Sequence, residues 1–135
     1  MNYETRVVSV AVALPADAVY EVAHRIENLP LWASGLATTL QHENGEWFAE
    51  SPAGRVTIAM VPRNPYGVLD HDVTLPDGVT LHIAFRVTTT GDGSLLSLVV
   101  LRMPDATDEA FEQDVALVAK DLAALKSLLE GNVFA

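Results

Sequence analysis

The sequence predicts an α+β protein in which a curved antiparallel sheet of seven strands wraps around a long C-terminal helix. Two observations predict this fold class. Short β-rich runs alternate with regular turn signals through the middle of the chain, and the last segment changes to a helical period. Residues 1–135 are expected to form a single domain, because that length can bury a core but is too short for two ordinary domains.

Residues 4–14 predict the first strand, because valine and leucine alternate on one face over positions 8 to 14. Pro15 stops this strand and can occupy the first position of a helix. Apolar residues then follow at helical spacing until Pro30 breaks the pattern, and residues 31–36 are expected to form a second short helical piece. Two short helices therefore follow the first strand.

The middle of the chain reads as a meander of short strands. Turn signals such as Asn44-Gly45 and Pro76-Asp77-Gly78 separate the β-rich runs, and consecutive strands joined by tight turns pair in antiparallel fashion. The first strand is expected to pair with the last one in the same sheet. The six predicted strands of the meander cover residues 37–43, 46–51, 55–61, 66–75, 79–90 and 94–103.

Residues 108–130 predict the long helix, with Thr107 as its N-cap. An apolar stripe runs along it with spacings of 4, 3, 4, 3 and 4 residues. The same spacing fits a short coiled-coil seam, but we favour burial against the sheet, because no other element is large enough to cover the sheet's apolar face. The stripe consists of Phe111, Val115, Val118, Leu122, Leu125 and Leu129.

Composition narrows the classes of partner. The net charge of −10 repels phosphate backbones and anionic lipid surfaces, so neither nucleic acid nor a membrane is expected. The chain has no cysteine and no apolar run of about 18 residues, and its N-terminus does not resemble a signal peptide. The expected location is the cytoplasm, and no cofactor is expected. G-x-S-x-G, glycine-rich phosphate-loop and H-E-x-x-H motifs are all absent.

Asp70-His71-Asp72, together with His82, resembles a set of metal ligands, but strand geometry argues against a metal site. Successive residues of a strand point to opposite faces, so His71 separates from both aspartates. A three-residue loop at Pro76-Asp77-Gly78 would pair residues whose numbers add to 154. His71 would then face the core, with the two aspartates outside in ordinary cross-strand charge pairs with His82 and Arg86.

A two-residue loop would shift this register by one position. His71, His82 and Arg86 would then share one face and could all point into the interior of the sheet. The sequence leaves this alternative open.

The order of elements resembles the helix-grip fold of the SRPBCC superfamily, which includes START lipid-transfer domains, birch-pollen-allergen-like proteins and polyketide cyclase/dehydrase-like proteins. The resemblance covers the whole chain. It is carried by Leu14-Pro15-Ala16-Asp17-Ala18-Val19-Tyr20, by Leu31-Trp32, by Gly67-Val68-Leu69-Asp70-His71-Asp72-Val73 and by the C-terminal helix. It implies a cavity between sheet and helix that holds an apolar or aromatic small molecule. It does not imply one reaction.

The first hypothesis is therefore the binding of a lipid- or polyketide-like molecule, with His71 as a lone polar anchor. The second is a cyclase or dehydratase that transfers protons through His71, His82 or Arg86. The third is a protein-binding module like the chaperone-activating members of the superfamily, and a homodimer is also left open. The residues expected to line the cavity are Trp32, His71, Phe85, Leu98, Phe111, Val115 and Leu122.

Overall fold

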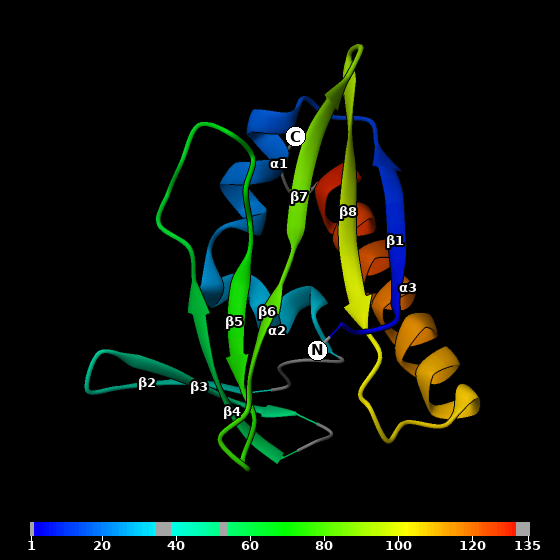
Figure 1. The fold of residues 1–135 in the computed structure, drawn as a ribbon. Helices are drawn as coiled ribbons and strands as arrows, with labels where there is room; N and C mark the ends of the chain where they lie inside the picture. Colours follow the sequence, from blue (N-terminus) through cyan, green and yellow to red (C-terminus); the bar gives the residue numbers. More distant parts are fainter. Residues whose placement is uncertain (1, 35–38, 52–53, 132–135) are drawn as a thin grey trace.

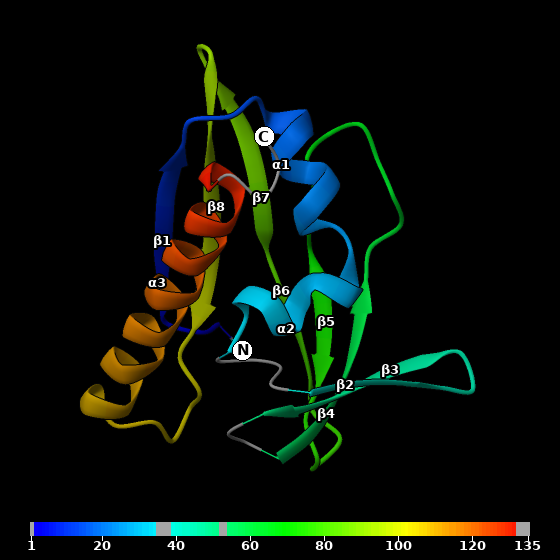
Figure 2. The same ribbon diagram turned by 180° about the vertical axis from the view of Figure 1, so that it is seen from behind.

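A strongly curved antiparallel sheet packs its inner face against three helices, α1 (Ala16–Ala23), α2 (Leu29–Trp32) and α3 (Asp108–Glu130) (Figures 1 and 2). The computed structural model describes residues 2–34, 39–51 and 54–131. Figure 2 shows all three helices on the same side of the strands, with α3 running obliquely over β1 and β8. The predicted fold class is confirmed.

The strands form two antiparallel ladders, one in the order β1-β8-β7 and the other in the order β2-β3-β4-β5-β6. The first strand pairs with the last, as predicted, with Val8 opposite Leu98. A short 3-10 turn, η1 (Ile26–Asn28), connects α1 to α2. The strands are β1 (Thr5–Val12), β2 (Thr39–Glu43), β3 (Glu46–Ser51), β4 (Gly54–Met60), β5 (His71–Thr74), β6 (Thr80–Ile83), β7 (Phe85–Thr90) and β8 (Gly93–Leu101).

The sheet bends where the two ladders meet, and this bend divides the predicted strand 79–90 into β6 and β7 at Ala84. The segment before β5 lies along β7 there: the Leu69 N–H donates to the Phe85 carbonyl (2.8 Å), and the Val87 N–H donates to the Gly67 carbonyl (3.0 Å). Gly67 permits this approach, because it has a φ of +71° and a Cβ would lie 2.4 Å from the Val87 oxygen. The predicted strand 66–75 is consequently regular only from His71.

Turn geometry fixes the register of the hairpins. Asn44 and Gly45 both have positive φ (52° and 80°), as in a type I′ turn, so the turn predicted at Asn44-Gly45 joins β2 to β3. Around the loop at residues 76–78, the Leu75 N–H donates to the Val79 carbonyl (2.8 Å). His71 therefore lies opposite Ile83. The three-residue loop and its register are confirmed, and the alternative two-residue register is wrong.

The C-terminal helix has the predicted bounds. Thr107 caps it, since its Oγ1 accepts a hydrogen bond from the Ala110 N–H (3.0 Å). Its apolar face packs on β1 and β8. The second helix, α2, ends at Trp32. Residues 35–36 of the predicted second helix and 37–38 of the following predicted strand lie outside the described residues.

Leu122→Ala tests the packing of α3. Leu122 is 1% exposed, so the substitution should lower the free energy of unfolding by about 2–5 kcal/mol through lost transfer energy and a larger void. Leu31→Ala is the matched control, because Leu31 is 63% exposed and should lose no more than about 0.5 kcal/mol. Urea unfolding measures both. A loss below about 1 kcal/mol at Leu122 would contradict this packing.

Candidate functional site

A cavity of about 310 Å³ lies between the inner face of the sheet and α3. Side chains from the three helices and from β3 to β8 form its walls, and most of them are apolar. Five of the seven predicted lining residues line it: Trp32, His71, Phe85, Leu98 and Leu122. The inner face of the bent sheet and the facing side of α3 thus enclose an apolar site.

Phe111 and Val115 do not line the cavity. Phe111 is buried in the first turn of α3, where the guanidinium groups of Arg6 and Arg102 lie 5.4 and 5.6 Å from its ring centre. Val115 is only half-buried. Both residues belong to the apolar stripe, but of that stripe only Val118 and Leu122 line the cavity.

Two carboxylates that are not among the predicted lining residues, Asp114 and Asp121, line the cavity from α3. They flank Val118 at spacings of four and three residues, so the three share one side of the helix. Asp121 is buried and accepts a hydrogen bond from the Ser34 hydroxyl (2.9 Å), whereas Asp114 is exposed. This spacing is the signal in the sequence that places Asp114 and Asp121 on one side of the helix.

Three aromatic rings meet in one part of the cavity. The Phe85 ring contacts both of the others: its centre is 5.8 Å from that of Trp32 and 6.3 Å from that of His71. The His71 and Phe85 rings meet edge to face, at an interplanar angle of 86°. The Trp32 Nε1 is buried without a hydrogen-bond partner among the described residues. Trp32 and Phe85 thus form an aromatic wall beside the imidazole of His71.

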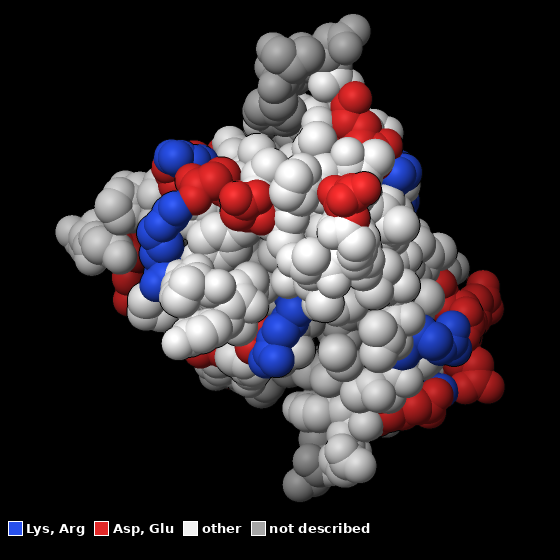
Figure 3. Space-filling model, turned by 90° about the horizontal axis from the view of Figure 1, so that it is seen from above, with Lys and Arg blue, Asp and Glu red and all other residues white. Residues whose placement is uncertain are grey.

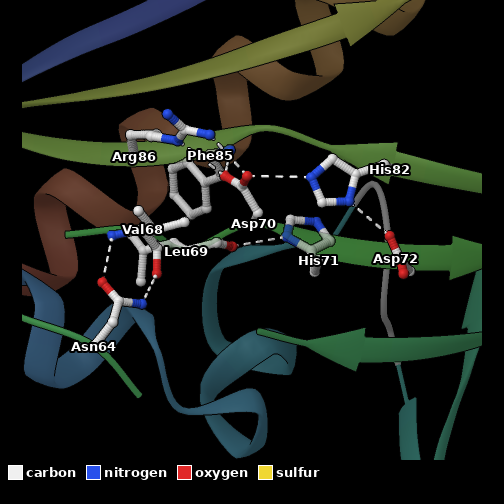
Figure 4. Close-up of polar contacts among 9 residues, drawn as sticks. All are labelled: Asn64, Val68, Leu69, Asp70, His71, Asp72, His82, Phe85 and Arg86. Atoms are coloured by element: carbon white, nitrogen blue, oxygen red, sulfur yellow. Dashed lines mark hydrogen bonds and ion pairs between the residues drawn. The ribbon is translucent and has the colours of Figure 1, made fainter. Parts of the chain in front are cut away.

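His71 presents a hydrogen-bond acceptor to this cavity. Its Nδ1 lies 3.1 Å from the Leu69 carbonyl oxygen (Figure 4), and a carbonyl can only accept, so Nδ1 carries the proton. Burial lowers the pKa of His71 below its ordinary value, so the ring is neutral at pH 7. The remaining nitrogen, Nε2, is therefore unprotonated and has no partner among the described residues.

His82 and Arg86, the other two predicted polar candidates, lie on the outer face of the sheet. Their side chains are 58% and 54% exposed, and neither lines the cavity. Both converge on Asp70 (Figure 4): Arg86 donates to its carboxylate from Nη2 (2.9 Å) and Nε (3.2 Å), and His82 Nε2 lies 3.1 Å from it. The structure thus places His71 apart from His82 and Arg86.

Asp70 itself corrects one prediction. It was expected in an ordinary charge pair on a solvated face, but its side chain is only 6% exposed. The bend at Ala84 turns the Phe85 N–H toward it, and that group donates to the carboxylate (2.9 Å). A buried carboxylate needs such partners, because an unpaired one would carry a large desolvation cost.

The contacts among Asp70, Asp72, His82 and Arg86 shift two pKa values in opposite directions. Burial of Asp70 raises its pKa, but hydrogen bonds from Arg86, the Phe85 N–H and His82 outweigh this effect and lower the pKa to about 2. Hydrogen bonds to Asp72 (2.8 Å) and Asp70 raise the pKa of His82. One ring nitrogen of His82 faces each carboxylate, so the raised pKa favours the protonated form that bridges them.

Asp70→Asn tests this buried carboxylate. Its lowered pKa means that the charged form stabilises the fold above about pH 4, and that this contribution is lost as the pH falls toward 2. The substitution should reduce the free energy of unfolding by about 2 kcal/mol at pH 7. The difference from the unaltered protein should shrink as urea unfolding is repeated between about pH 5 and pH 2.

Asp72→Asn is the matched control, because the Asp72 side chain is 50% exposed and should contribute little. A difference between the unaltered protein and Asp70→Asn that stays constant across this pH range would contradict the assignment.

The described residues contain no group of three or more His, Asp or Glu side chains placed to hold a metal ion. None of the described helices has the length and apolar character needed to cross a membrane. Seen from above, acidic and basic side chains are interspersed on the surface (Figure 3). An ion pair between Arg55 and Glu43, at 3.0 Å, joins β4 to β2.

No family model and no curated protein matches the chain, but solved structures do. MLL2253 from Mesorhizobium loti aligns with a TM-score of 0.72 at 15% identity, over 96% of this chain and 98% of its own. DynU16, a protein in the dynemicin biosynthetic locus, aligns with a TM-score of 0.70 at 17% identity, over 96% of this chain and 48% of its own. Truncated norcoclaurine synthase from Thalictrum flavum aligns with a TM-score of 0.64 at 15% identity, over 98% of each chain. These likenesses concern the fold.

Proposed function

We propose that this chain, which has an SRPBCC-like helix-grip fold, binds an apolar or aromatic small molecule of lipid- or polyketide-like character in the cavity beneath α3. The cavity carries this proposal. Its volume of about 310 Å³ lies at the lower end of the roughly 300–1,000 Å³ typical of small-molecule sites. Its walls are apolar with few polar groups, which is the usual composition of such sites.

The names of two similar structures support a small-molecule ligand. One is named as a synthase of norcoclaurine, and the other, DynU16, belongs to a biosynthetic locus. A shared fold does not carry a reaction from one protein to another. The comparison therefore supports a small-molecule ligand in general, and the apolar walls of the cavity support its apolar character and its place.

The cyclase or dehydratase alternative depended on proton transfer by His71, His82 or Arg86. Of these three residues, only His71 lines the cavity; the side chains of His82 and Arg86 are exposed and contact Asp70. General acid–base chemistry also needs a group that reaches the reacting atom. Binding is accordingly the function that we propose.

A protein-binding module would use an exposed apolar patch. The large hydrophobic residues that are exposed in the described chain belong to four different segments: β1, α2, the loop before β5 and the turn before β6. They are Val7, Leu31, Tyr66 and Val79. The exposed hydrophobic residues are thus spread over separate segments, and the cavity supports a function better than they do.

Val118→Phe tests the proposal by filling the cavity. Val118 lines it from α3 and is partly buried, so a larger ring there should occupy the space of the ligand. Titration with an uncharged, environment-sensitive apolar dye, such as N-phenyl-1-naphthylamine, should show binding to the unaltered protein. The substitution should weaken this binding by about tenfold or more, equivalent to at least about 1.4 kcal/mol.

Ala116→Phe supplies the matched control, since it adds the same ring to an exposed position of the same helix outside the cavity. Its dye affinity should equal that of the unaltered protein. Equal loss in both variants, or no loss in Val118→Phe, would contradict binding in the cavity.

A further inference from the structure

Apart from the Trp32 indole, the polar side chains that line the cavity offer acceptors to a ligand. Among the described lining residues there is no lysine or arginine. Asp114 and Asp121 contribute carboxylates, and Ser51 already donates its hydroxyl proton to the Gly54 carbonyl (2.8 Å). The Trp32 indole N–H is a donor, but other atoms cover its nitrogen, which therefore offers no accessible surface to a ligand.

His71 is the acceptor that lies deepest among aromatic residues. The Leu69 carbonyl holds its Nδ1–H, which leaves the lone pair of Nε2 as the only hydrogen-bonding capacity of the neutral ring. A carbonyl or ether oxygen cannot pair with a lone pair, whereas a hydroxyl can donate to it. The Phe85 ring stands edge-on to the imidazole and beside Trp32. A flat aromatic ligand would therefore contact apolar surface next to this acceptor.

Resting on the proposed function, we infer that the cavity selects an uncharged aromatic molecule that carries a hydroxyl group, and that this hydroxyl donates a hydrogen bond to Nε2 of His71. The same walls discriminate against carboxylate ligands such as fatty acids. An anion in the cavity would lose its hydration without gaining a cationic partner from the described lining residues. It would also lie near the carboxylates of Asp114 and Asp121.

Three naphthalene derivatives of similar size test this inference by isothermal titration calorimetry at pH 7. 2-Naphthol has the hydroxyl donor, 2-methoxynaphthalene has the oxygen without the proton, and 2-naphthoate carries a carboxylate. The unaltered protein should bind 2-naphthol about five- to tenfold more tightly than 2-methoxynaphthalene, the ratio that one net hydrogen bond supplies. Binding of 2-naphthoate should be weaker than that of both.

His71→Phe removes the acceptor and keeps an aromatic ring. It should abolish the preference for 2-naphthol while leaving the affinity for 2-methoxynaphthalene within about twofold. His42→Phe is the matched control, because His42 is exposed on β2 and lies outside the cavity lining. It should keep the preference of the unaltered protein.

The comparison within the unaltered protein decides the inference even if His71→Phe fails to fold. Equal affinity for 2-naphthol and 2-methoxynaphthalene, or binding of 2-naphthoate as tight as that of 2-naphthol, would overturn the inference and leave the proposed function standing. Absence of binding for all three compounds would overturn the proposed function together with the inference.

Discussion

The geometry of the site depends on the hydrogen bonds that the Asp70 carboxylate accepts. Asp70 is the last residue of the irregular segment before β5, and its carboxylate accepts from the Phe85 N–H and the Arg86 side chain at the start of β7. It therefore joins the two ladders at the bend. Phe85, held by this contact, is also the ring that stands between Trp32 and His71 in the cavity. A buried charge on one face thus positions the aromatic wall on the other.

Alternation along one strand separates two chemical environments. Asp70 and its partners remain charged on the outer face, whereas His71 is buried among apolar residues and stays neutral. The separation follows from the period of two in a β-strand. It explains why a sequence with clustered aspartates and histidines builds an ion-pair network and a neutral acceptor rather than a metal site.

Local sequence signals predicted much of this structure, and long-range contacts account for the remainder. The loop at residues 76–78 fixed the register that directs His71 inward, and Thr107 with the apolar period fixed the bounds of α3. The burial of Asp70 could not be predicted, because it follows from the close approach of Gly67 to β7. Asp121 was missed for a similar reason, since its burial depends on Ser34 and the rotation of α3 against the sheet.

The central claim is that a ligand enters the cavity between the sheet and α3. Methyl NMR spectra of protein labelled at isoleucine, leucine and valine, recorded during a titration with 2-naphthol, test it most directly. The account predicts chemical-shift changes in the methyl groups of Ile83, Leu98 and Val118, which line the cavity. The methyl groups of Val7 and Val79, which are exposed elsewhere, should not change. Changes confined to Val7, Val79 or other surface methyl groups would contradict it.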